Sequence, residues 1–203
     1  MTPREGIFAH WPNRITALRF VGSLVLFAIF SSMTTKPPGP PPGLLTQLAF
    51  WLFIFTALTD ILDGYLARRD NLVTAFGRVA DPFVDKVLVL GAMIYLTSFD
   101  WTRPWFPAWI TVIVLAREFL VTGIRGYIES LGLPFPADWF GKVKMLLQCV
   151  AISVVLGMFA WGIHIPFWNW TAHLLVYGTL LTSVGSGLSY VLRTKRLLTE
   201  AAR

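Results

Sequence analysis

The sequence contains little of what soluble enzymes and secreted domains depend on. Cysteine occurs once, at Cys149, which excludes both a disulfide framework and a cysteine-based metal site. Charged residues make up only 14% of the 203 positions, whereas hydrophobic residues make up 55%. A chain with so few charges indicates a polytopic membrane protein rather than a soluble globule.

The few charges that are present are mostly basic, giving a formal net charge of +6 and a pI near 9.8. A basic balance can indicate a nucleic-acid-binding protein. In a chain this apolar, basic residues that flank cytoplasmic helix ends and face anionic lipid head groups explain the charge more simply. We therefore expect membrane lipids, and no nucleic acid, as partners.

The distribution of apolar stretches predicts an all-α polytopic membrane protein that forms a single domain over residues 1–203. An interfacial segment at 1–14 would precede a six-helix core at 15–196. The six predicted transmembrane helices cover residues 15–33, 44–69, 78–99, 108–130, 139–162 and 171–192. Lysine and arginine concentrate at both termini and after the second and fourth helices, which predicts that both termini are cytoplasmic. We expect the protein in the inner (cytoplasmic) membrane.

Four aspartates stand out in this apolar chain. Asp60 and Asp63 are spaced i, i+3 near the end of the second predicted helix, and Asp81 and Asp85 are spaced i, i+4 near the start of the third. Each spacing puts two side chains on one helix face, and the short connection puts all four on the cytoplasmic side. Carboxylates beside hydrocarbon cost roughly 2.5 to 3.5 kcal/mol each at mid-bilayer, and they repel one another, so cations must compensate them.

Two interpretations of the compensating cations remain open at this point. The aspartates could form structural ion pairs with neighbouring arginine and lysine side chains, or they could hold divalent ions. Oxygen-only ligands favour Mg²⁺ or Mn²⁺ over zinc, and paired metals bridged by carboxylates suit in-line displacement at phosphorus. A metal-dependent enzyme acting on a phosphate-bearing lipid follows, with a transporter or proton relay as the remote alternative.

Basic residues in the fourth and fifth predicted helices lie on the same side of the membrane as the aspartates. They are Arg117, Arg125, Lys142 and Lys144. Guanidinium and ammonium groups bind phosphate, so these four side chains are candidates for receiving an anionic acceptor. Anchoring of the helix ends at the cytoplasmic surface is the alternative explanation for them.

Three motifs carry a resemblance to a known family. The first is Asp60-x-x-Asp63-Gly64-x-x-Ala67-Arg68, followed after eight residues by Gly77-x-x-x-Asp81-x-x-x-Asp85. The others are Pro12-Asn13-x-x-Thr16-x-x-Arg19, and Ala116-Arg117-Glu118 together with Gly141-Lys142-x-Lys144-x-x-x-Gln148. The chain resembles the CDP-alcohol phosphatidyltransferase family over nearly its whole length, and most of all its bacterial phosphatidylglycerophosphate synthases.

This resemblance implies a reaction and a site. The donor would be CDP-diacylglycerol, the acceptor sn-glycerol 3-phosphate, and the products phosphatidylglycerol phosphate and CMP, made at a site facing the cytoplasm. Two ions, Mg²⁺ or Mn²⁺, would be held by Asp60, Asp63 and Asp81 with Asp85, which would also be the general base. The CDP moiety would contact Asp60, Gly64, Ala67, Arg68 and Gly77. The acceptor phosphate would contact Thr16, Arg19, Arg117, Arg125, Lys142 and Lys144.

The resemblance also implies a homodimer. It leaves the acceptor open, because the aspartate signature handles the donor that the whole family shares. Inositol phosphate, serine or a phospholipid remain alternative acceptors.

Overall fold

A computed structural model of the chain describes residues 11–34, 43–69, 75–132 and 139–201. The side chains of residues 11–12, 34, 60–69, 75–79, 139–140, 198 and 200–201 lie outside this description. The described part is all-helical, with no strand. Its six helices are α1 Trp11–Thr34, α2 Gly43–Arg69, α3 Ala75–Ser98, α4 Ala108–Ser130, α5 Trp139–Trp161 and α6 Pro166–Ala201.

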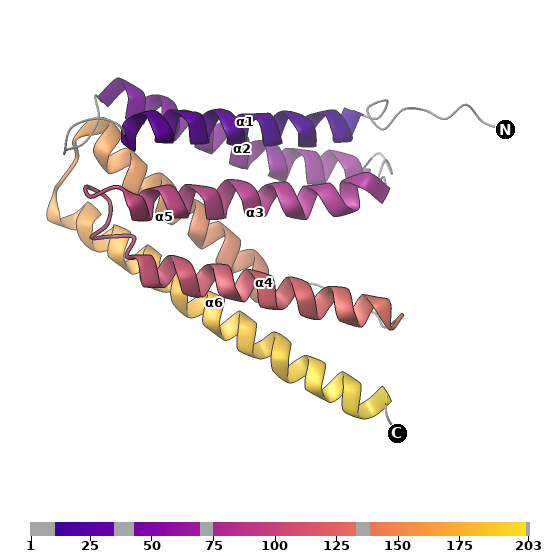
Figure 1. Cartoon of the computed structure of the whole chain (residues 1–203). Helices are drawn as coiled ribbons and strands as arrows, with labels where there is room; N and C mark the ends of the chain where they lie inside the picture. Colours follow the sequence, from indigo (N-terminus) through magenta and orange to yellow (C-terminus); the bar gives the residue numbers. More distant parts are fainter. Residues whose placement is uncertain (1–10, 35–42, 70–74, 133–138, 202–203) are drawn as a thin grey trace.

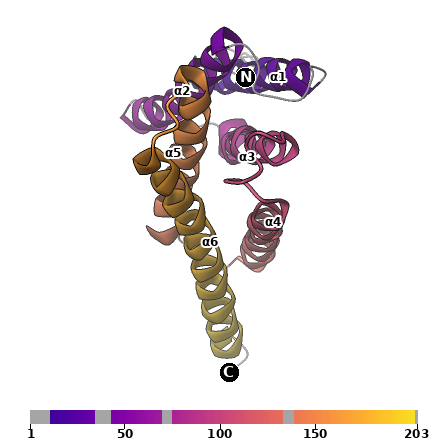
Figure 2. The same cartoon turned by 90° about the vertical axis from the view of Figure 1, so that its left-hand side faces the viewer.

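Consecutive helices run in opposite directions, so alternate connections lie at opposite ends of the molecule (Figure 1). The start of α1, the end of α2, the start of α3 and the ends of α4 and α6 all lie at one end. Figure 2 shows α3 and α4 on one side of the molecule and α5 and α6 on the other. The aspartate signature lies at this end, where α2 ends and α3 begins.

Glycine and proline set several helix boundaries. Gly132 and Gly162 have φ values of 72° and 66°, a left-handed conformation that glycine adopts without a steric penalty. Gly162 directly follows the end of α5 and Gly132 lies two residues past the end of α4, and the Ile163 N–H donates back to the Met158 carbonyl at 2.9 Å. Pro166 begins α6, where its missing N–H costs no helical hydrogen bond.

The helix bounds agree with the sequence-based prediction to within a few residues for α2, α4 and α5. The largest difference is at α6, which begins five residues before the predicted 171 and continues nine residues past the predicted 192. Hydropathy marks the part of a helix that suits hydrocarbon, not the whole helix. Pro82 also lies deeper than expected, in the interior of α3 rather than its first turn, because α3 already begins at Ala75.

The hydrophobic core lies between the helices in the half of the molecule away from the aspartates. Its largest fully buried side chains include Phe30, Phe53, Met93 and Phe106. Helix α1 packs closely on α3 at Gly91, where an added Cβ would lie only 2.1 Å from the Cζ atom of Phe27. The α1–α3 contact therefore depends on a residue without a side chain.

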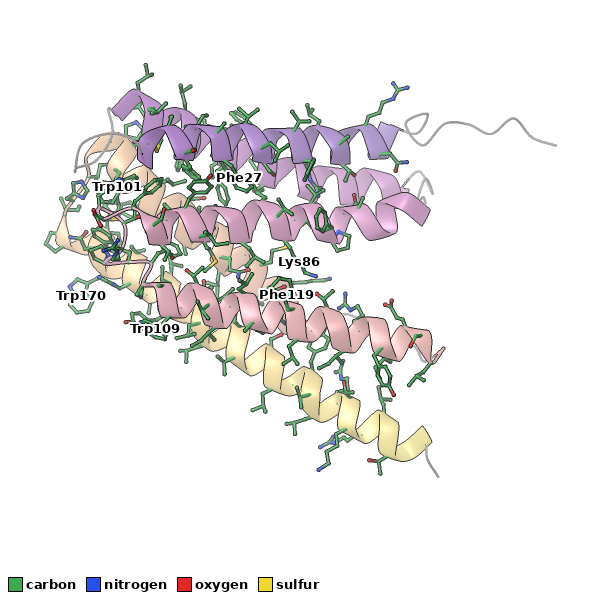
Figure 3. The ribbon with its side chains drawn as sticks, in the orientation of Figure 1. Phe27, Lys86, Trp101, Trp109, Phe119 and Trp170 are labelled. Carbon is green, nitrogen blue, oxygen red and sulfur yellow. The ribbon has the colours of Figure 1, made fainter. Side chains whose placement is uncertain are left out.

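The outer surface of the helices is also apolar. Leu174, Leu181 and Leu188 on α6 are each more than half exposed, and Trp109 and Trp170 lie at the end of the molecule away from the aspartates (Figure 3). Such a surface suits lipid rather than water. Within the described residues, three helices contain stretches long and apolar enough to cross a membrane: Asn13–Met33, Gly141–Trp161 and Pro166–Leu197.

Candidate active site

The antiparallel α2–α3 pair brings the positions of the four aspartates to one end of the molecule (Figure 1). Asp60 and Asp63 fall in the last turns of α2, and Asp81 and Asp85 fall in the first half of α3. The side chains of Asp60 and Asp63 are outside the described residues. The same holds for the predicted CDP contacts, which are Gly64, Ala67, Arg68 and Gly77.

Helix α1 contacts both signature aspartates whose side chains are described, Asp81 and Asp85. The Thr16 hydroxyl donates to Asp81 Oδ1 at 2.5 Å, and the Arg19 guanidinium forms an ion pair with Asp85 Oδ1. Thr16 and Arg19 are both buried, one turn apart on α1, and they face two aspartates one turn apart on α3. Both residues were predicted to contact an acceptor phosphate. The structure places them against the carboxylates.

A polar cavity of about 530 Å³ lies beside Asp85 and is lined by α3, α4, α5 and α6. Its described lining includes five basic side chains and three acidic ones, an excess of two positive charges. The basic residues are Lys86, Arg117, Arg125, Lys142 and Lys144, and the acidic ones are Asp85, Glu118 and Glu129. All four basic residues predicted in α4 and α5 are therefore brought together around one cavity, whereas Thr16 and Arg19 are not in its lining.

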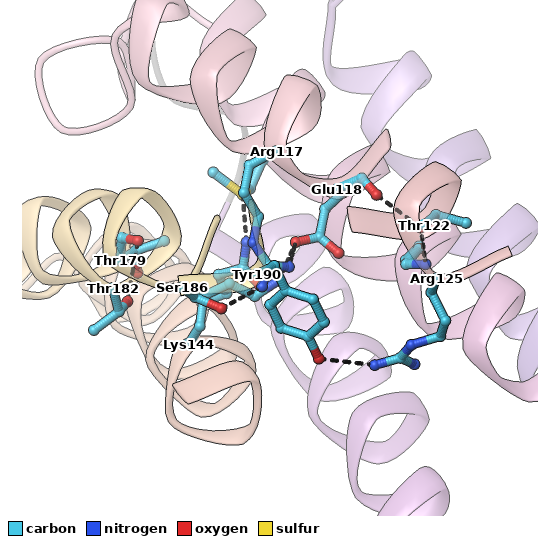
Figure 4. Close-up of polar contacts among 12 residues, drawn as sticks. Arg117, Glu118, Thr122, Arg125, Lys144, Thr179, Thr182, Ser186 and Tyr190 are labelled. Carbon is cyan, nitrogen blue, oxygen red and sulfur yellow. Dashed lines mark hydrogen bonds and ion pairs between the residues drawn. The ribbon is translucent and has the colours of Figure 1, made fainter. Parts of the chain in front are cut away.

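Two of these basic side chains share one buried carboxylate. Glu118 Oε1 accepts a hydrogen bond from Arg117 Nη1 at 2.6 Å and also contacts Lys144 Nζ (Figure 4). The second guanidinium nitrogen of Arg117 donates to the hydroxyl of Ser186 on α6. The stem of Arg117 runs close to Gly187, where an added Cβ would lie 3.1 Å from Arg117 Cγ.

Arg125 and Lys86 have neutral partners instead. Arg125 Nη2 donates to the hydroxyl of Tyr190 at 2.9 Å, and Lys86 Nζ donates to Thr122 Oγ1 at 2.6 Å. Figure 3 shows Lys86 between α3 and α4. Neither of these two partners carries a negative charge, so neither contact offsets the charge of the cation for an anion in the cavity.

Sequence reasoning did not assign Lys86, Glu118, Ser186 or Tyr190 to the site. Lys86 directly follows Asp85, and Glu118 is an acid in the middle of an apolar helix, so both had a detectable signal. Tyr190 and Ser186 had none, because they reach the cavity only through the packing of α6 on α4.

A second, apolar cavity of about 720 Å³ lies between α2, α5 and the start of α6. Phe50, Phe53, Met145 and Val154 are among its lining residues. Lys142 lines both this cavity and the polar one. An apolar space therefore adjoins the charged site, as a substrate with both a hydrocarbon part and an anionic part requires.

The described residues can be tested for a metal site. They contain no cluster of three or more histidine, cysteine, aspartate or glutamate side chains, since only two of the four aspartates are in the described set. The donor chemistry of the signature is nevertheless uniform, because every candidate ligand is a carboxylate, the ligand type preferred by Mg²⁺ and Mn²⁺. Asp81 and Asp85 share one face of α3, and the helix ends that carry Asp60 and Asp63 lie beside it.

Comparison with known proteins connects these features. Over 189 residues the chain is 34% identical to a probable phosphatidylglycerophosphate synthase of Mycobacterium tuberculosis, covering 93% of this chain and 83% of that protein. It is 31% identical over 186 residues to the CDP-diacylglycerol–glycerol-3-phosphate 3-phosphatidyltransferase of Rickettsia bellii, covering 91% and 95% of the two chains. The equally named Bacillus subtilis protein is 44% identical over 105 residues, about 52% of each chain.

The family model for CDP-alcohol phosphatidyltransferases matches residues 9–184, a range that contains α1 to α5 and all four aspartates of the signature. The chain therefore belongs to the CDP-alcohol phosphatidyltransferase family and is an enzyme of that class.

Proposed function

We propose that this enzyme transfers the phosphatidyl group of CDP-diacylglycerol to sn-glycerol 3-phosphate, giving phosphatidylglycerol phosphate and CMP. The observation that carries the proposal is the basic cavity beside Asp85. Its excess of two positive charges matches a phosphate monoester, which carries about −1.5 to −2 charges at neutral pH. The printed names of the relatives, which specify the same donor and acceptor, support the same choice.

Asp85 would be the general base. The proposal is supported by its place in the lining of the cavity in which the acceptor would lie, and by the ion pair with Arg19, which orients its carboxylate. In the proposed step, a hydroxyl oxygen of the acceptor forms a bond to the β-phosphorus of the donor. The bond between that phosphorus and CMP breaks, and the hydroxyl proton moves to Asp85.

Asp60, Asp63, Asp81 and Asp85 are the residues that would hold two divalent ions, Mg²⁺ or Mn²⁺. When bound, these ions would neutralise the diphosphate of the donor. The hydroxyl of Thr16 would orient the carboxylate of Asp81, and the guanidinium of Arg19 would orient that of Asp85. Helix α1 would thus fix the orientation of two of the proposed ligands. By family likeness, Gly64, Ala67, Arg68 and Gly77 would contact the CDP moiety.

The membrane arrangement belongs to the proposal as well. All six helices would span the inner membrane, with both termini and the active site at the cytoplasmic side, and two chains would form a homodimer. The positions of basic residues support the cytoplasmic placement of this end, because Arg125, Lys144 and Arg193 all lie in the parts of their helices nearer to where α2 ends and α3 begins.

An acceptor panel tests the function. Purified protein in detergent is supplied with CDP-diacylglycerol labelled in its lipid part and, separately, with sn-glycerol 3-phosphate, inositol phosphate, serine or a phospholipid. Of the four acceptors, we expect only sn-glycerol 3-phosphate to give CMP release and a labelled phosphatidylglycerol phosphate. A labelled product with another head group, and none with sn-glycerol 3-phosphate, would refute the proposed acceptor while leaving the family assignment intact.

A further inference from the structure

Glu118 is the most buried acidic side chain in the lining of the polar cavity, at 6% exposure, yet it has no part in the reaction described above. The two cations that it contacts are also buried, Arg117 at 8% and Lys144 at 5% exposure. One carboxylate oxygen, Oε1, accepts from both (Figure 4). Two like charges are thereby held beside each other in a place where water can screen them little.

The contact between Glu118 and Lys144 also joins two helices across the cavity. In the described part of the chain, α4 packs on α3 and α6, and α5 packs on α2, α3 and α6, but α4 and α5 do not pack on each other. The Glu118–Lys144 ion pair therefore bridges them where the backbones do not meet. Ser186 on α6 fixes the other side of the Arg117 guanidinium.

Building on the proposed function, we propose that Glu118 is a positioning residue for the acceptor. It holds Lys144 and Arg117 side by side in the cavity wall, where both can contact the acceptor phosphate. Without its carboxylate, Lys144 would lose the ion pair that holds it in place. A different role, in which the acceptor phosphate displaces Glu118 from the two cations, predicts the opposite effect on affinity.

The decisive variant is Glu118→Gln, which keeps the size of the side chain and removes its charge. We expect the KM for sn-glycerol 3-phosphate to rise about 10-fold or more, as for other truncations of one partner in a buried charge pair, while the KM for CDP-diacylglycerol stays unchanged. An acceptor KM that is unchanged or lower overturns the proposal, and a lower value identifies displacement.

The matched control is Glu129→Gln on the same helix. Glu129 is exposed at the edge of the same cavity, so this variant changes the cavity's charge equally without touching the Arg117–Lys144 contact. We expect no rise in acceptor KM. An equal rise in both variants would show that net charge alone matters, which overturns the positioning role.

A double variant separates positioning from simple ion pairing. Lys144→Gln should raise the acceptor KM, and adding Glu118→Gln should raise it little further, because Glu118 acts through Lys144. If the pair served stability alone, the double variant would regain the wild-type acceptor KM, since no buried charge would be left unpaired. That recovery would overturn the proposal.

Glu118→Asp keeps the test decisive if Glu118→Gln does not fold. It retains the charge but moves the carboxylate back by one methylene, so we expect an acceptor KM between those of wild type and Glu118→Gln. A wild-type acceptor KM in this variant would show that the position of the carboxylate is unimportant, and would overturn the proposal.

A binding measurement without turnover distinguishes failure of this inference from failure of the proposed function. Inorganic phosphate should raise the thermal unfolding temperature of the wild type and of Glu129→Gln, and raise that of Glu118→Asp less. Wild-type protein that makes no product from sn-glycerol 3-phosphate but shows these shifts would refute the proposed acceptor and support Glu118. Equal shifts in all three proteins would overturn the role of Glu118.

Discussion

At the scale of single residues, the ion pair between Arg19 and Asp85 gives α1 a direct role in the site. The family resemblance implied that Arg19 contacts the acceptor phosphate, and this remains a prediction. The structure shows its guanidinium on Asp85, outside the lining of the polar cavity. Arg19 is therefore in a position to orient the proposed base.

We predict that Arg19→Gln lowers kcat about 10-fold or more and changes the KM for sn-glycerol 3-phosphate little, because the contact serves the reacting carboxylate rather than the bound acceptor. Steady-state CMP release at varied acceptor concentration measures both constants.

Asp85→Asn is the reference variant for this comparison. It should abolish CMP release while CDP-diacylglycerol still binds, because the amide cannot accept the proton. If Arg19→Gln instead raised the acceptor KM at unchanged kcat, Arg19 would be an acceptor ligand, as the resemblance implied.

Some residues of the candidate site could be predicted from the sequence and others could not, and the reason is physical. The aspartates and the basic residues of α4 and α5 were predictable, because charge is costly in an apolar chain and helical spacing puts it on one face. The partners of those charges were not predictable. Tyr190 and Ser186 are ordinary residues of an apolar helix, and they reach Arg125 and Arg117 only after α6 packs on α4.

At the scale of helices, the α2–α3 pair carries the four aspartates of the signature at one end of the molecule. Its two helix ends lie together because the intervening connection is short, and they carry all four aspartates of the signature. Four carboxylates at one place repel one another unless cations neutralise them, and the described ion pair with Arg19 accounts for one of the four.

We therefore predict that removal of divalent ions with a chelator abolishes phosphatidyl transfer and that Mg²⁺ or Mn²⁺ restores it. Zinc should restore it poorly, because hard oxygen ligands do not favour that ion. Labelled product formation after dialysis and re-addition of each metal is the measurement. Full activity in the metal-free preparation would contradict a carboxylate-held metal and favour structural ion pairs.

The α1–α3 contact makes a separate prediction about stability. Gly91→Ala adds a Cβ that would lie 2.1 Å from Phe27 Cζ, so the Phe27 ring, which stacks on Tyr95, must move. Overpacking of this kind costs about 1 to 3 kcal/mol, and we expect a lower thermal unfolding temperature in detergent.

Gly185→Ala is the matched control on α6. An added Cβ there meets nothing within 4 Å, so the higher helix propensity of alanine should leave stability equal or slightly raised. Equal unfolding temperatures for Gly91→Ala and wild type would show that α1 and α3 can separate without cost.

At the scale of the whole molecule, the sequence predicted six helices and their order because each apolar stretch is interrupted by glycine, proline or charge. Over the described residues, the structure confirms the all-helical fold and the six helices. Among these helices, α1, α5 and α6 contain stretches long and apolar enough to cross a membrane, whereas the charged residues within α3 and α4 reduce the hydropathy of those two helices. Cavity-lining charge and membrane insertion make opposite demands on α3 and α4.

The orientation of the whole chain can be measured because cysteine is so scarce. Cys149 lines the apolar cavity, so Cys149→Ala should leave a folded protein without native thiols. Into this background we would place Arg103→Cys or Lys195→Cys, two exposed positions at opposite ends of the molecule. Lys195 lies in α6 at the end that carries the aspartates, and Arg103 lies in the turn after α3.

We predict that a membrane-impermeant maleimide labels Arg103→Cys from outside the inner membrane, and labels Lys195→Cys only when the cytoplasmic face is opened. The reason is that basic helix ends are retained on the cytoplasmic side, and a soluble acceptor and CMP must reach the site from there. Activity of both variants confirms their fold. External labelling of Lys195→Cys would show that the chain has the opposite orientation in the membrane. The aspartates would then lie on the outer face, away from the cytoplasmic supply of acceptor.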